Sequence, residues 1–442
     1  MGRETGNHIL VFAPCNFTYF EFMKIFAVLF FLFALHANAQ TKSYLLQPDR
    51  VFDGEKMHTG WSVFVQGDKI VAAGASNIIE SSNDVEVIKL SGATLLPGLI
   101  EGHSHLLLHP YNETSWDDQV LKESDAYRVA RATVHAKNTL MAGFTTVRDL
   151  GSEGAGYADV GLKKAINDGI IPGPRMLVAG RAIVATGSYG PKGFDTDFNI
   201  MLGAETADGN DLVRVVRDQM GKGADIIKVY ADYRWGVKGE ARPSFSIEEL
   251  KLIVETARST GRPTVAHAST MEGMRRAILA GVETIEHGDD GTLEIFQLMK
   301  DKNVALCPTL AAGDAIAQYR GWKKGVDPES DKLKAKRKSF QAAILAGVTI
   351  CAGGDVGVFA HGDNVRELEM MAEYGMSADA VLRSVTSVNA DAFHIADQVG
   401  RVKENLRADF VIVTGDPSKN ISDLRKVLLV MKDGVIYRNE VK

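Results

Sequence analysis

Two histidines separated by one residue, His103 and His105, end a short apolar run in the segment LLPGLIEGHSH. Residues two apart on a β-strand point to the same face, so both imidazoles would face one side of a sheet. A pair of this kind arises by chance as readily as by function. Its meaning therefore depends on which other reactive side chains fall at the ends of comparable runs.

Lys228 interrupts an otherwise apolar run, Ile226-Ile227-Lys228-Val229. A lysine in such a run is either paired with a buried acid or desolvated, and desolvation lowers its pKa. A neutral lysine amine can add carbon dioxide to form a carbamate, whose two oxygens can bridge two divalent cations. The residues alone leave both interpretations open.

Three further ionisable side chains end short β-like runs. His267 ends PTVAHA, His287 falls in TIEHG, and Asp355 ends TICAGGD. Imidazoles and carboxylates are common ligands of zinc and related metals. Each residue alone could be a hydrogen-bonded core histidine or a helix-capping aspartate, but their joint occurrence at strand ends predicts a metal site.

The elements that must position these side chains alternate along residues 96–397. Eight short apolar runs end in polar residues, and helical stretches such as 127–142, 246–259, 270–280 and 292–300 separate them. Ser246 and Glu249 form a predicted capping box. The alternation favours a (β/α)₈ (TIM) barrel of the α/β class, in which catalytic groups lie at the C-terminal ends of the strands. An open doubly wound sheet is disfavoured, because no G-x-G-x-x-G follows the first run.

Both ends of the remaining chain read as β-hairpins. Residues 40–95 and 398–442 carry β-branched runs broken by turn residues, and Asp433-Gly434 is a strong hairpin signal. We expect the two ends to combine in a small β-sandwich. Cys307 and Cys351 lie in neighbouring predicted barrel strands, where buried free thiols and a disulfide bridge both remain open.

The first 39 residues resemble a signal peptide rather than part of the fold. Lys24 precedes an apolar run of eleven residues, and Ala37-Asn38-Ala39 has the small-residue pattern of a cleavage site. Met23 is an alternative start. We expect an exported protein, periplasmic or secreted, with no stable membrane span after cleavage. A net charge of −6 gives no reason to expect a nucleic-acid partner.

The five strand-end positions resemble the binuclear amidohydrolase superfamily: H-x-H on strand one, Lys on four, His on five and six, Asp on eight. LLPGLIEGHSH and the terminal GRVKENLRADFVIVTGDP resemble its strand-one signature and its return into the β-sandwich. TTVRDLG, IIKVYADYRWG, TVAHAST, AGVETIEHG and AGGDVGVFAHGDNVREL are similar to the imidazolonepropionase-like subgroup, which includes zinc-dependent Xaa-Pro dipeptidases. The resemblance covers almost all of the chain after residue 39.

This resemblance implies a pair of metal ions. It assigns one ion to His103, His105 and Asp355. It assigns the second ion to His267 and His287. Zinc is the first expectation, with manganese, cobalt and iron as alternatives.

Carboxylated Lys228 would bridge the two ions, which would share a hydroxide. Asp355 would take the proton of that hydroxide during attack and pass it to the leaving nitrogen. The expected reaction is hydrolysis of an amide or peptide bond in a small-molecule or peptide substrate, with an Xaa-Pro dipeptidase as one form. Relatives often assemble, so a homo-oligomer is expected.

Two other functions compete with this one. A mononuclear deaminase or cyclic-amide hydrolase of the imidazolonepropionase type would need only one metal ion, and such relatives lack the bridging lysine. A non-catalytic binding protein on a decayed barrel should have lost a ligand, and here none is lost.

Substrate contacts are predicted at three positions. Tyr230 lies two residues after Lys228, where its hydroxyl could polarise a carbonyl or hold a carboxylate, or simply pack. Arg148 could bind a substrate carboxylate or pair with Asp149 or another acid. His361, in a Gly-rich loop, is either a contact or a mobile rim residue.

The chain departs from the subgroup at two places. A loop that carries G-G-H-G in many members reads T-G-S-Y-G here, at residues 186–190, so a histidine donor is missing and Tyr189 is the open replacement. The usual glycine of the C-terminal turn is Asn405, which tolerates the left-handed conformation.

Overall fold

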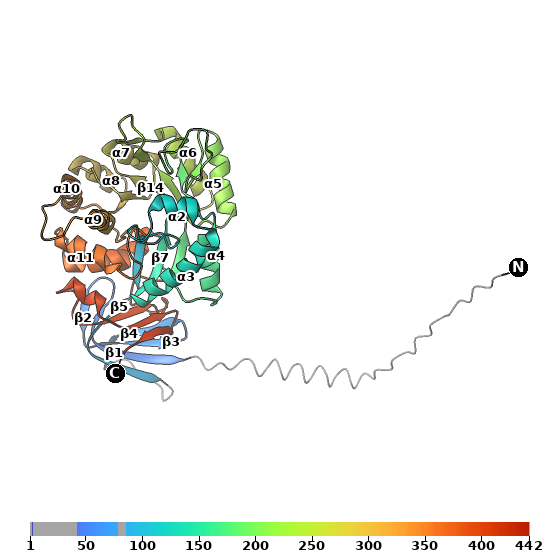
Figure 1. Cartoon of the computed structure of the whole chain (residues 1–442). Helices are drawn as coiled ribbons and strands as arrows, with labels where there is room; N and C mark the ends of the chain where they lie inside the picture. The colour runs from blue at the N-terminus through green and yellow to red at the C-terminus, as the bar shows by residue number, and fades with distance from the viewer. Residues whose placement is uncertain (1, 3–41, 78–84, 442) are drawn as a thin grey trace. The chain divides into compact units, whose positions relative to one another are not determined.

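The computed structural model describes residues 2, 42–77 and 85–441. Apart from Gly2, the predicted signal peptide, residues 1–39, and the alternative start at Met23 lie outside the described residues. All described helices and strands belong to one compact unit, Ser43–Lys442 (Figure 1).

Seven parallel strands form most of a barrel. They are β6 (Leu99–Ser104), β7 (Phe144–Asp149), β8 (Arg175–Val178), β11 (Ile227–Tyr230), β14 (Thr264–Ala268), β15 (Thr284–His287) and β16 (Ala305–Cys307). Strands β6, β7 and β8 pair in one group, and β11, β14, β15 and β16 pair in a second.

Backbone contacts join the two groups into a closed ring. The amide of Ile226 donates to the carbonyl of Val178 at 3.3 Å, which links β8 to β11. Segment 350–356 supplies the eighth position through two isolated parallel bridges, Leu306↔Ile350 and Ser104↔Val356. The predicted (β/α)₈ barrel is therefore confirmed, and the open-sheet alternative is excluded because no strand of the ring is left as an edge.

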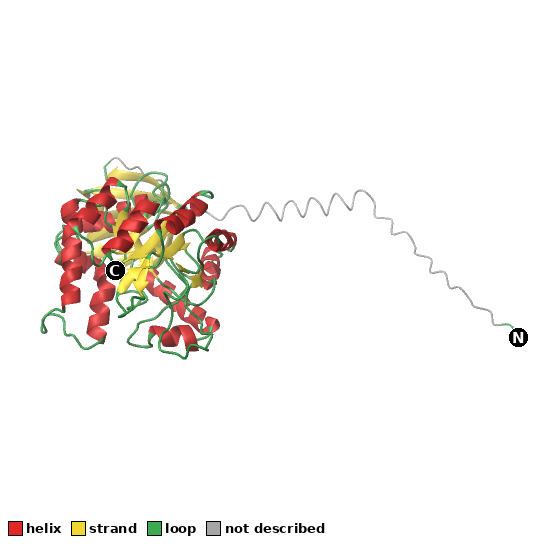
Figure 2. Ribbon diagram, turned by 90° about the horizontal axis from the view of Figure 1, so that it is seen from above, coloured by secondary structure: helices red, strands yellow, loops and turns green. Residues whose placement is uncertain are grey.

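Helices surround these strands (Figure 2). The longer ones are α3 (Asp125–Met141), α4 (Ala158–Asn167), α5 (Asp211–Gly221), α6 (Ile247–Arg258), α7 (Met271–Ala280), α8 (Leu293–Asp301), α9 (Leu310–Tyr319), α10 (Asp331–Ala346) and α11 (Val365–Glu373). Shorter helices are α2 (Trp116–Lys122), α12 (Ala378–Arg383), the π-turn η1 (Ser384–Val388), α13 (Asn389–Ala392) and the 3₁₀ turn η2 (Ile421–Arg425). The predicted capping box is present: Ser246 Oγ accepts from the amide of Glu249, and the Glu249 carboxylate accepts from the amide of Ser246.

Short strands lie in the loops that follow the barrel strands. Strand β12 (Asp232–Arg234) follows β11 and pairs with β13 (Ala241–Pro243), and β9 (Ile183–Val184) pairs with β10 (Glu205–Thr206). These loops carry several aromatic side chains to the C-terminal end of the barrel.

Both ends of the described chain build one eight-stranded sheet. Its members are β1 (Ser43–Phe52), β2 (Met57–Thr59), β3 (Trp61–Gln66), β4 (Lys69–Ala75), β5 (Glu86–Pro97), β17 (Phe410–Thr414), β18 (Val427–Lys432) and β19 (Val435–Asn439). Strand β5 pairs in parallel with β1 and antiparallel with β17, which joins the two ends (Figure 1).

The two ends of this sheet curve toward each other and enclose its apolar face. An isolated bridge, Lys69↔Arg407, and a hydrogen bond of 3.0 Å from the amide of Ile70 to the carbonyl of Leu406 connect β4 to the segment before β17. The enclosed core draws residues from β1, β3, β4, β5, β17 and β18. This is the predicted β-sandwich, formed by strands from both ends of the chain.

Two predicted turns have the expected backbone. Asp433 and Gly434 join β18 to β19 with φ of +50° and +71°. Asn405 has φ +69°, as expected for an asparagine in a turn that usually carries glycine. Both predictions are confirmed.

Cys307 and Cys351 are buried free thiols. Burial raises the pKa of Cys351 to about 12, so the thiol keeps its proton. Among the described residues, no helix combines the length and the hydropathy needed to cross a bilayer.

Gly434 lies where the β18–β19 turn approaches the β3–β4 turn closely. A Cβ at this position would lie 1.7 Å from the backbone oxygen of Gly67, in the facing β3–β4 turn. Gly60 has a similar φ, +69°, but a Cβ there meets no atom within 4 Å. Gly60→Ala should therefore cost only the left-handed conformation, about 1 kcal/mol, and Gly434→Ala about 3 kcal/mol because the backbone must also move. Chemical denaturation of both variants measures this, and equal costs would show that the two turns are not in close contact.

Candidate active site

The six residues expected to hold metal ions converge at the C-terminal end of the barrel. The ring centroids of His103 and His105 are 5.3 Å apart, and those of His103 and His287 are 5.2 Å apart. His267 lies 4.4 Å from His287, centroid to centroid. Asp355 Oδ1 is 3.3 Å from His105 Nε2 and 3.6 Å from His103 Nε2.

Hydrogen bonds behind the imidazoles determine which nitrogen faces the centre. His103 Nδ1 donates to the Glu286 carboxylate at 2.8 Å, and His105 Nδ1 donates to the carbonyl of Gly151 at 2.9 Å. Because a carbonyl and a carboxylate only accept, the Nε2 of each neutral ring keeps its lone pair. Both Nε2 atoms face Asp355. This is the arrangement that a metal-binding histidine requires.

His287 and His267 are held from other directions. His287 Nδ1 lies 2.7 Å from Thr309 Oγ1, so its Nε2 is also available. His267 Nε2 lies 3.8 Å from Asp232 Oδ1, beyond hydrogen-bond distance, and the ring stacks on Tyr230. Sequence analysis did not identify Thr309 or Asp232, because neither belongs to the pattern of strand-end ligands.

Lys228 is fully buried on β11, and its Nζ has no hydrogen-bond partner. Within the described part of the chain, no carboxylate lies within ion-pair distance of this nitrogen, so the alternative of a lysine paired with a buried acid is not what the structure shows. Burial lowers the pKa of Lys228, which favours the neutral amine. The Lys228 amine is therefore buried and shifted toward its neutral form.

Burial also keeps three of the imidazoles neutral. It lowers the pKa of His103 to about 4 and that of His267 to about 3, and it lowers the pKa of His287 well below its usual value. Burial raises the pKa of Asp355, but His103 and His105 outweigh it and bring the value to about 2. These three imidazoles and the ionised carboxylate have the protonation states in which such groups bind metals. His105 differs: burial lowers its pKa, but the hydrogen bond and charge of Asp355 outweigh burial and bring the value to about 9.

Backbone strain concentrates at the same place. His287, Thr309 and Asp355 have φ of +76°, +51° and +62°, although none is a glycine. Such conformations cost energy and persist only where the surroundings impose them. The ends of strand β15 and of segment 350–356 therefore aim these side chains by a conformation that the sequence pattern did not reveal.

Arg148 does not reach the open part of the site. Its guanidinium is 2 % exposed and donates to the carbonyl of Gly102 and to Thr284 and Glu286. The expected substrate contact is therefore not made, because Nε, Nη1 and Nη2 of Arg148 each donate to another part of the protein. The alternative, pairing with an acid, is correct, but the acid is Glu286 rather than Asp149.

Glu286 links this arginine to the metal site. One carboxylate oxygen accepts from Arg148 Nη2 at 2.8 Å and the other from His103 Nδ1 at 2.8 Å. Glu286, His103 and Cys307 also lie close enough together to hold an ion. The Arg148 cation beside Glu286 and the protonated thiol of Cys307 oppose that use. Glu286 precedes His287 in the apolar run TIEH, and an acid in such a run was the signal available in the sequence.

His361 is neither mobile nor at the rim. It is 7 % exposed, stacks on His135 with centroids 4.4 Å apart, and its Nε2 lies 3.0 Å from the carbonyl of Leu108. The alternative of a rim residue is therefore wrong, and the substrate contact at His361 stays a prediction. Its ring packs behind the strand-one loop.

Tyrosines form one wall of the site. Tyr230 stacks on His267 with centroids 4.5 Å apart, as its position two residues after Lys228 predicts. Tyr189 lies 4.7 Å from Tyr230 and 4.8 Å from Tyr233 between ring centroids. Tyr189 thus occupies the site from the loop that lacks a histidine. Its hydroxyl donates to Glu153 at 2.7 Å, a contact that the sequence did not predict.

A cleft of about 600 Å³ adjoins this wall. Its lining residues include Trp116, Lys192, Tyr233, Arg234 and Trp235. Tyr233 lines the cleft, and its ring centroid lies 6.1 Å from that of His267, so one tyrosine ring separates the cleft from an expected metal ligand.

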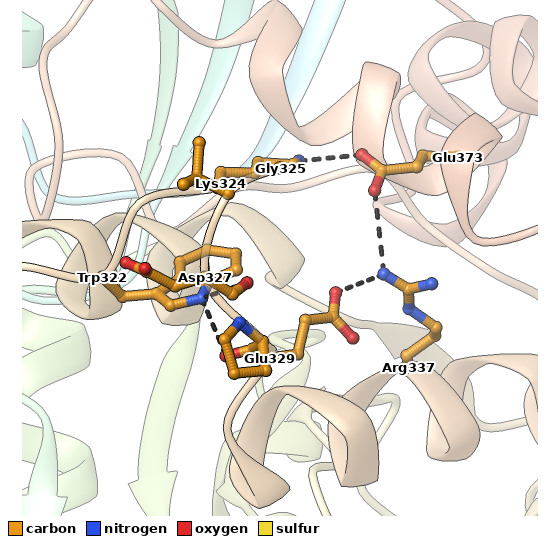
Figure 3. Close-up of a pocket in the computed structure, with 9 residues that line it drawn as sticks. Trp322, Lys324, Gly325, Asp327, Glu329, Arg337 and Glu373 are labelled. Carbon is orange, nitrogen blue, oxygen red and sulfur yellow. Dashed lines mark hydrogen bonds and ion pairs between the residues drawn. The ribbon is translucent and has the colours of Figure 1, made fainter.

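A second cavity, of about 550 Å³, lies elsewhere, in the loop between α9 and α10 (Figure 3). There Arg337 points toward Glu329 and Glu373, and Lys324 pairs with Glu373 at 2.8 Å. These ion pairs satisfy one another's charges. None of the expected ligands lines this cavity, so it is not the reaction site.

Comparisons with known proteins agree with this geometry. A model of the amidohydrolase family matches residues 94–437. Ochratoxinase from Aspergillus niger is 30 % identical over 424 residues, covering 87 % of this chain and 84 % of that protein. Its crystal structure has a TM-score of 0.75 and covers 90 % of this chain and 96 % of its own.

Two further solved structures are similar over their full lengths. A Xaa-Pro dipeptidase with bound methionine in the active site has a TM-score of 0.80 and 31 % identity, and covers 90 % of this chain and 100 % of its own. A prolidase complexed with N-methylphosphonate-L-proline has a TM-score of 0.78 and 26 % identity, with coverage of 90 % and 100 %. With the matched family model and these similarities over most of the chain, the protein belongs to the amidohydrolase family and is a hydrolase that acts on carbon–nitrogen bonds.

Proposed function

We propose that this protein is a binuclear metal-dependent amidohydrolase that cleaves the amide bond of a small peptide-like substrate, with Xaa-Pro dipeptides as first candidates. One observation carries the proposal. Lys228 places an unpartnered amine, fully buried, among four imidazoles and the carboxylate of Asp355. A buried polar atom without a partner is costly, and carboxylation followed by metal binding would relieve that cost.

The residues present fit such a metal pair. His103, His105 and Asp355 would hold one ion. His267 and His287 would hold the other. Zinc suits this set of imidazole and carboxylate ligands, and it suits hydrolysis without redox chemistry.

Carboxylated Lys228 would join the two ions as an anion. When bound, the metal pair supplies a nucleophile from water near neutral pH and polarises the scissile carbonyl. The remaining proton transfer is assigned to a residue of the chain. Asp355 is 15 % exposed at its side chain, so it faces the substrate and can take a proton from the attacking water and deliver it to the leaving nitrogen.

Tyr230 has the position of a hydrogen-bond donor to the substrate. Burial raises the pKa of its hydroxyl well above the usual value, so the group stays protonated and can donate. The ring of Tyr230 stacks on His267, so this tyrosine lies next to a proposed ligand of the second ion. A carbonyl or carboxylate oxygen of the substrate is the acceptor that this donor fits.

A mononuclear deaminase or cyclic-amide hydrolase is the second candidate. It would need one ion and no bridging lysine, so the buried, unpaired Lys228 argues against it. Two ions per chain, measured by elemental analysis of the metal-loaded protein, favour the binuclear enzyme. One ion per chain with full activity favours the second candidate.

Export completes the proposal. The Lys24–Ala39 pattern predicts cleavage after Ala39. An exported enzyme of this kind would act on small peptides or N-acyl amino acids outside the cytoplasm.

Replacing Lys228 tests the bridge. Lys228→Ala should lower bound metal below two ions per chain and reduce kcat/KM for a dipeptide about 100-fold, because the ions lose their shared anion. A short carboxylic acid such as propionate should restore part of both. Lys222→Ala, at an exposed lysine paired with Asp218, is the control and should leave both unchanged. Full metal loading and turnover in Lys228→Ala would remove the proposed bridge.

Replacing Asp355 tests the proton transfer. Asp355→Asn keeps an oxygen ligand but loses the base, so kcat should fall by about 10²–10⁴ while KM changes little. Steady-state kinetics and metal analysis of the same preparation separate lost chemistry from lost metal. Asp363→Asn, at a residue paired with Arg425, is the control. An unchanged kcat in Asp355→Asn would contradict this role.

A further inference from the structure

Glu153 is a buried carboxylate beside the metal site that the proposed reaction does not use. It lies in the loop after β7, is 4 % exposed, and has φ +49°. Arg128 holds this conformation: its Nη1 donates to the carbonyl of Glu153 at 2.7 Å and its Nη2 to the carbonyl of Ser152 at 3.1 Å. The guanidinium therefore anchors the backbone and leaves the carboxylate free for another partner.

Only one oxygen of the Glu153 carboxylate accepts hydrogen bonds, and both donors are neutral. Oε2 accepts from Tyr189 Oη at 2.7 Å and from Trp116 Nε1 at 2.9 Å. Oε1 accepts no hydrogen bond from the described residues, and none of their cationic side chains lies within ion-pair distance of either oxygen. A buried carboxylate is usually paired with a cation, but the neighbouring Arg128 donates to backbone carbonyls and makes no ion pair with this one.

The unpaired oxygen lies beside the imidazole of His105. A Cβ placed on Gly151 would lie 3.3 Å from Glu153 Oε1 and 3.6 Å from His105 Cε1, so the oxygen and the imidazole border the same point. The charge of Glu153 also contributes, after burial, to the raised pKa of Tyr230. Glu153 thus lies between a ligand of the first ion and the tyrosine wall.

Aromatic rings surround the same position. Trp116 and Tyr189 meet edge to face with centroids 5.3 Å apart, and Tyr189 contacts Tyr230 and Tyr233. Ring faces attract cations, and their effect adds to that of a carboxylate in a site that excludes water. A carboxylate with one free oxygen among four aromatic rings is a site for a substituted ammonium ion.

We propose that Glu153 binds the α-ammonium group of the substrate, so that the enzyme acts on dipeptides with a free amino terminus in preference to N-acylated amino acids. This inference rests on the proposed function, because it places the scissile carbonyl at the metal site. The ammonium of a dipeptide is attached to the carbon next to that carbonyl, which matches a carboxylate lying beside His105. A substrate without the ammonium would leave Glu153 buried and uncompensated.

The test compares two substrates that differ only in the amino group, alanyl-proline and propionyl-proline. With the metal-loaded protein at about pH 6.5, where an α-amino group is protonated, kcat/KM for alanyl-proline should be at least about tenfold higher. In Glu153→Gln this ratio should fall toward one, because the amide keeps the shape but not the charge. Asp118→Asn, which removes one charge from an exposed position of α2 near Trp116, should keep the wild-type ratio.

Binding gives a second measurement that does not need turnover. Calorimetry should show L-leucinamide binding the metal-loaded wild type at least about tenfold more tightly than 4-methylpentanamide, with the difference lost in Glu153→Gln. Melting temperature and metal content of the variant establish that it is folded and loaded.

The outcomes distinguish the two proposals. Equal handling of both members of each pair by the wild type, absence of binding by both amides, or an unchanged preference in Glu153→Gln overturns the role of Glu153. Loss of metal in Glu153→Gln also overturns it, because Glu153 would then be part of the metal site. Failure of the wild type to hydrolyse any amide, with leucinamide still preferred, overturns the proposed hydrolysis and leaves the ammonium site supported.

Discussion

The cost of burying an unpaired lysine governs this site. Lys228 is fully enclosed on β11, and its amine has neither an acid nor a hydrogen-bond acceptor in the described structure. Such a group cannot keep its charge cheaply in a medium of low dielectric constant, so its surroundings select the neutral form. In the proposed enzyme this neutral amine would be carboxylated, and the surrounding imidazoles and Asp355 would hold the cations that the resulting anion binds.

The groups around Lys228 are arranged to accept cations. Hydrogen bonds to Glu286, to the Gly151 carbonyl and to Thr309 turn three imidazoles so that a free nitrogen faces the centre. Arg148 supports this arrangement indirectly, because it pairs with Glu286, which in turn holds His103 in place. An arginine that looked available for a substrate thus supports His103 through Glu286, and truncating it would disturb that imidazole rather than a substrate contact.

The substrate side of the site is built from loops rather than strands. Tyr189, Tyr233, Trp116 and Glu153 come from four separate connections, and they meet beside His105 and His267. In the proposed enzyme the barrel strands would carry the chemistry and the loops the selectivity, which is the usual division in this fold. The tyrosine that stands in place of a loop histidine changes the wall from an imidazole donor to a hydroxyl already bonded to Glu153.

The sequence by itself determined the barrel, the β-sheet built from both ends, and the six side chains at the C-terminal ends of the strands. It could do so because the side-chain alternation of a strand and the turn preferences of Asp433-Gly434 and Asn405 are local properties, which need only neighbouring residues. Only the tertiary structure decided that Arg148 pairs with Glu286, that His361 is buried against His135, and that Glu153 lies beside His105 without an ion-pair partner. These outcomes depend on residues far apart in the chain: Arg148 and Glu286 are separated by 138 positions. Which charges meet in a buried space is set by how the ring of strands closes, and no local pattern encodes that closure.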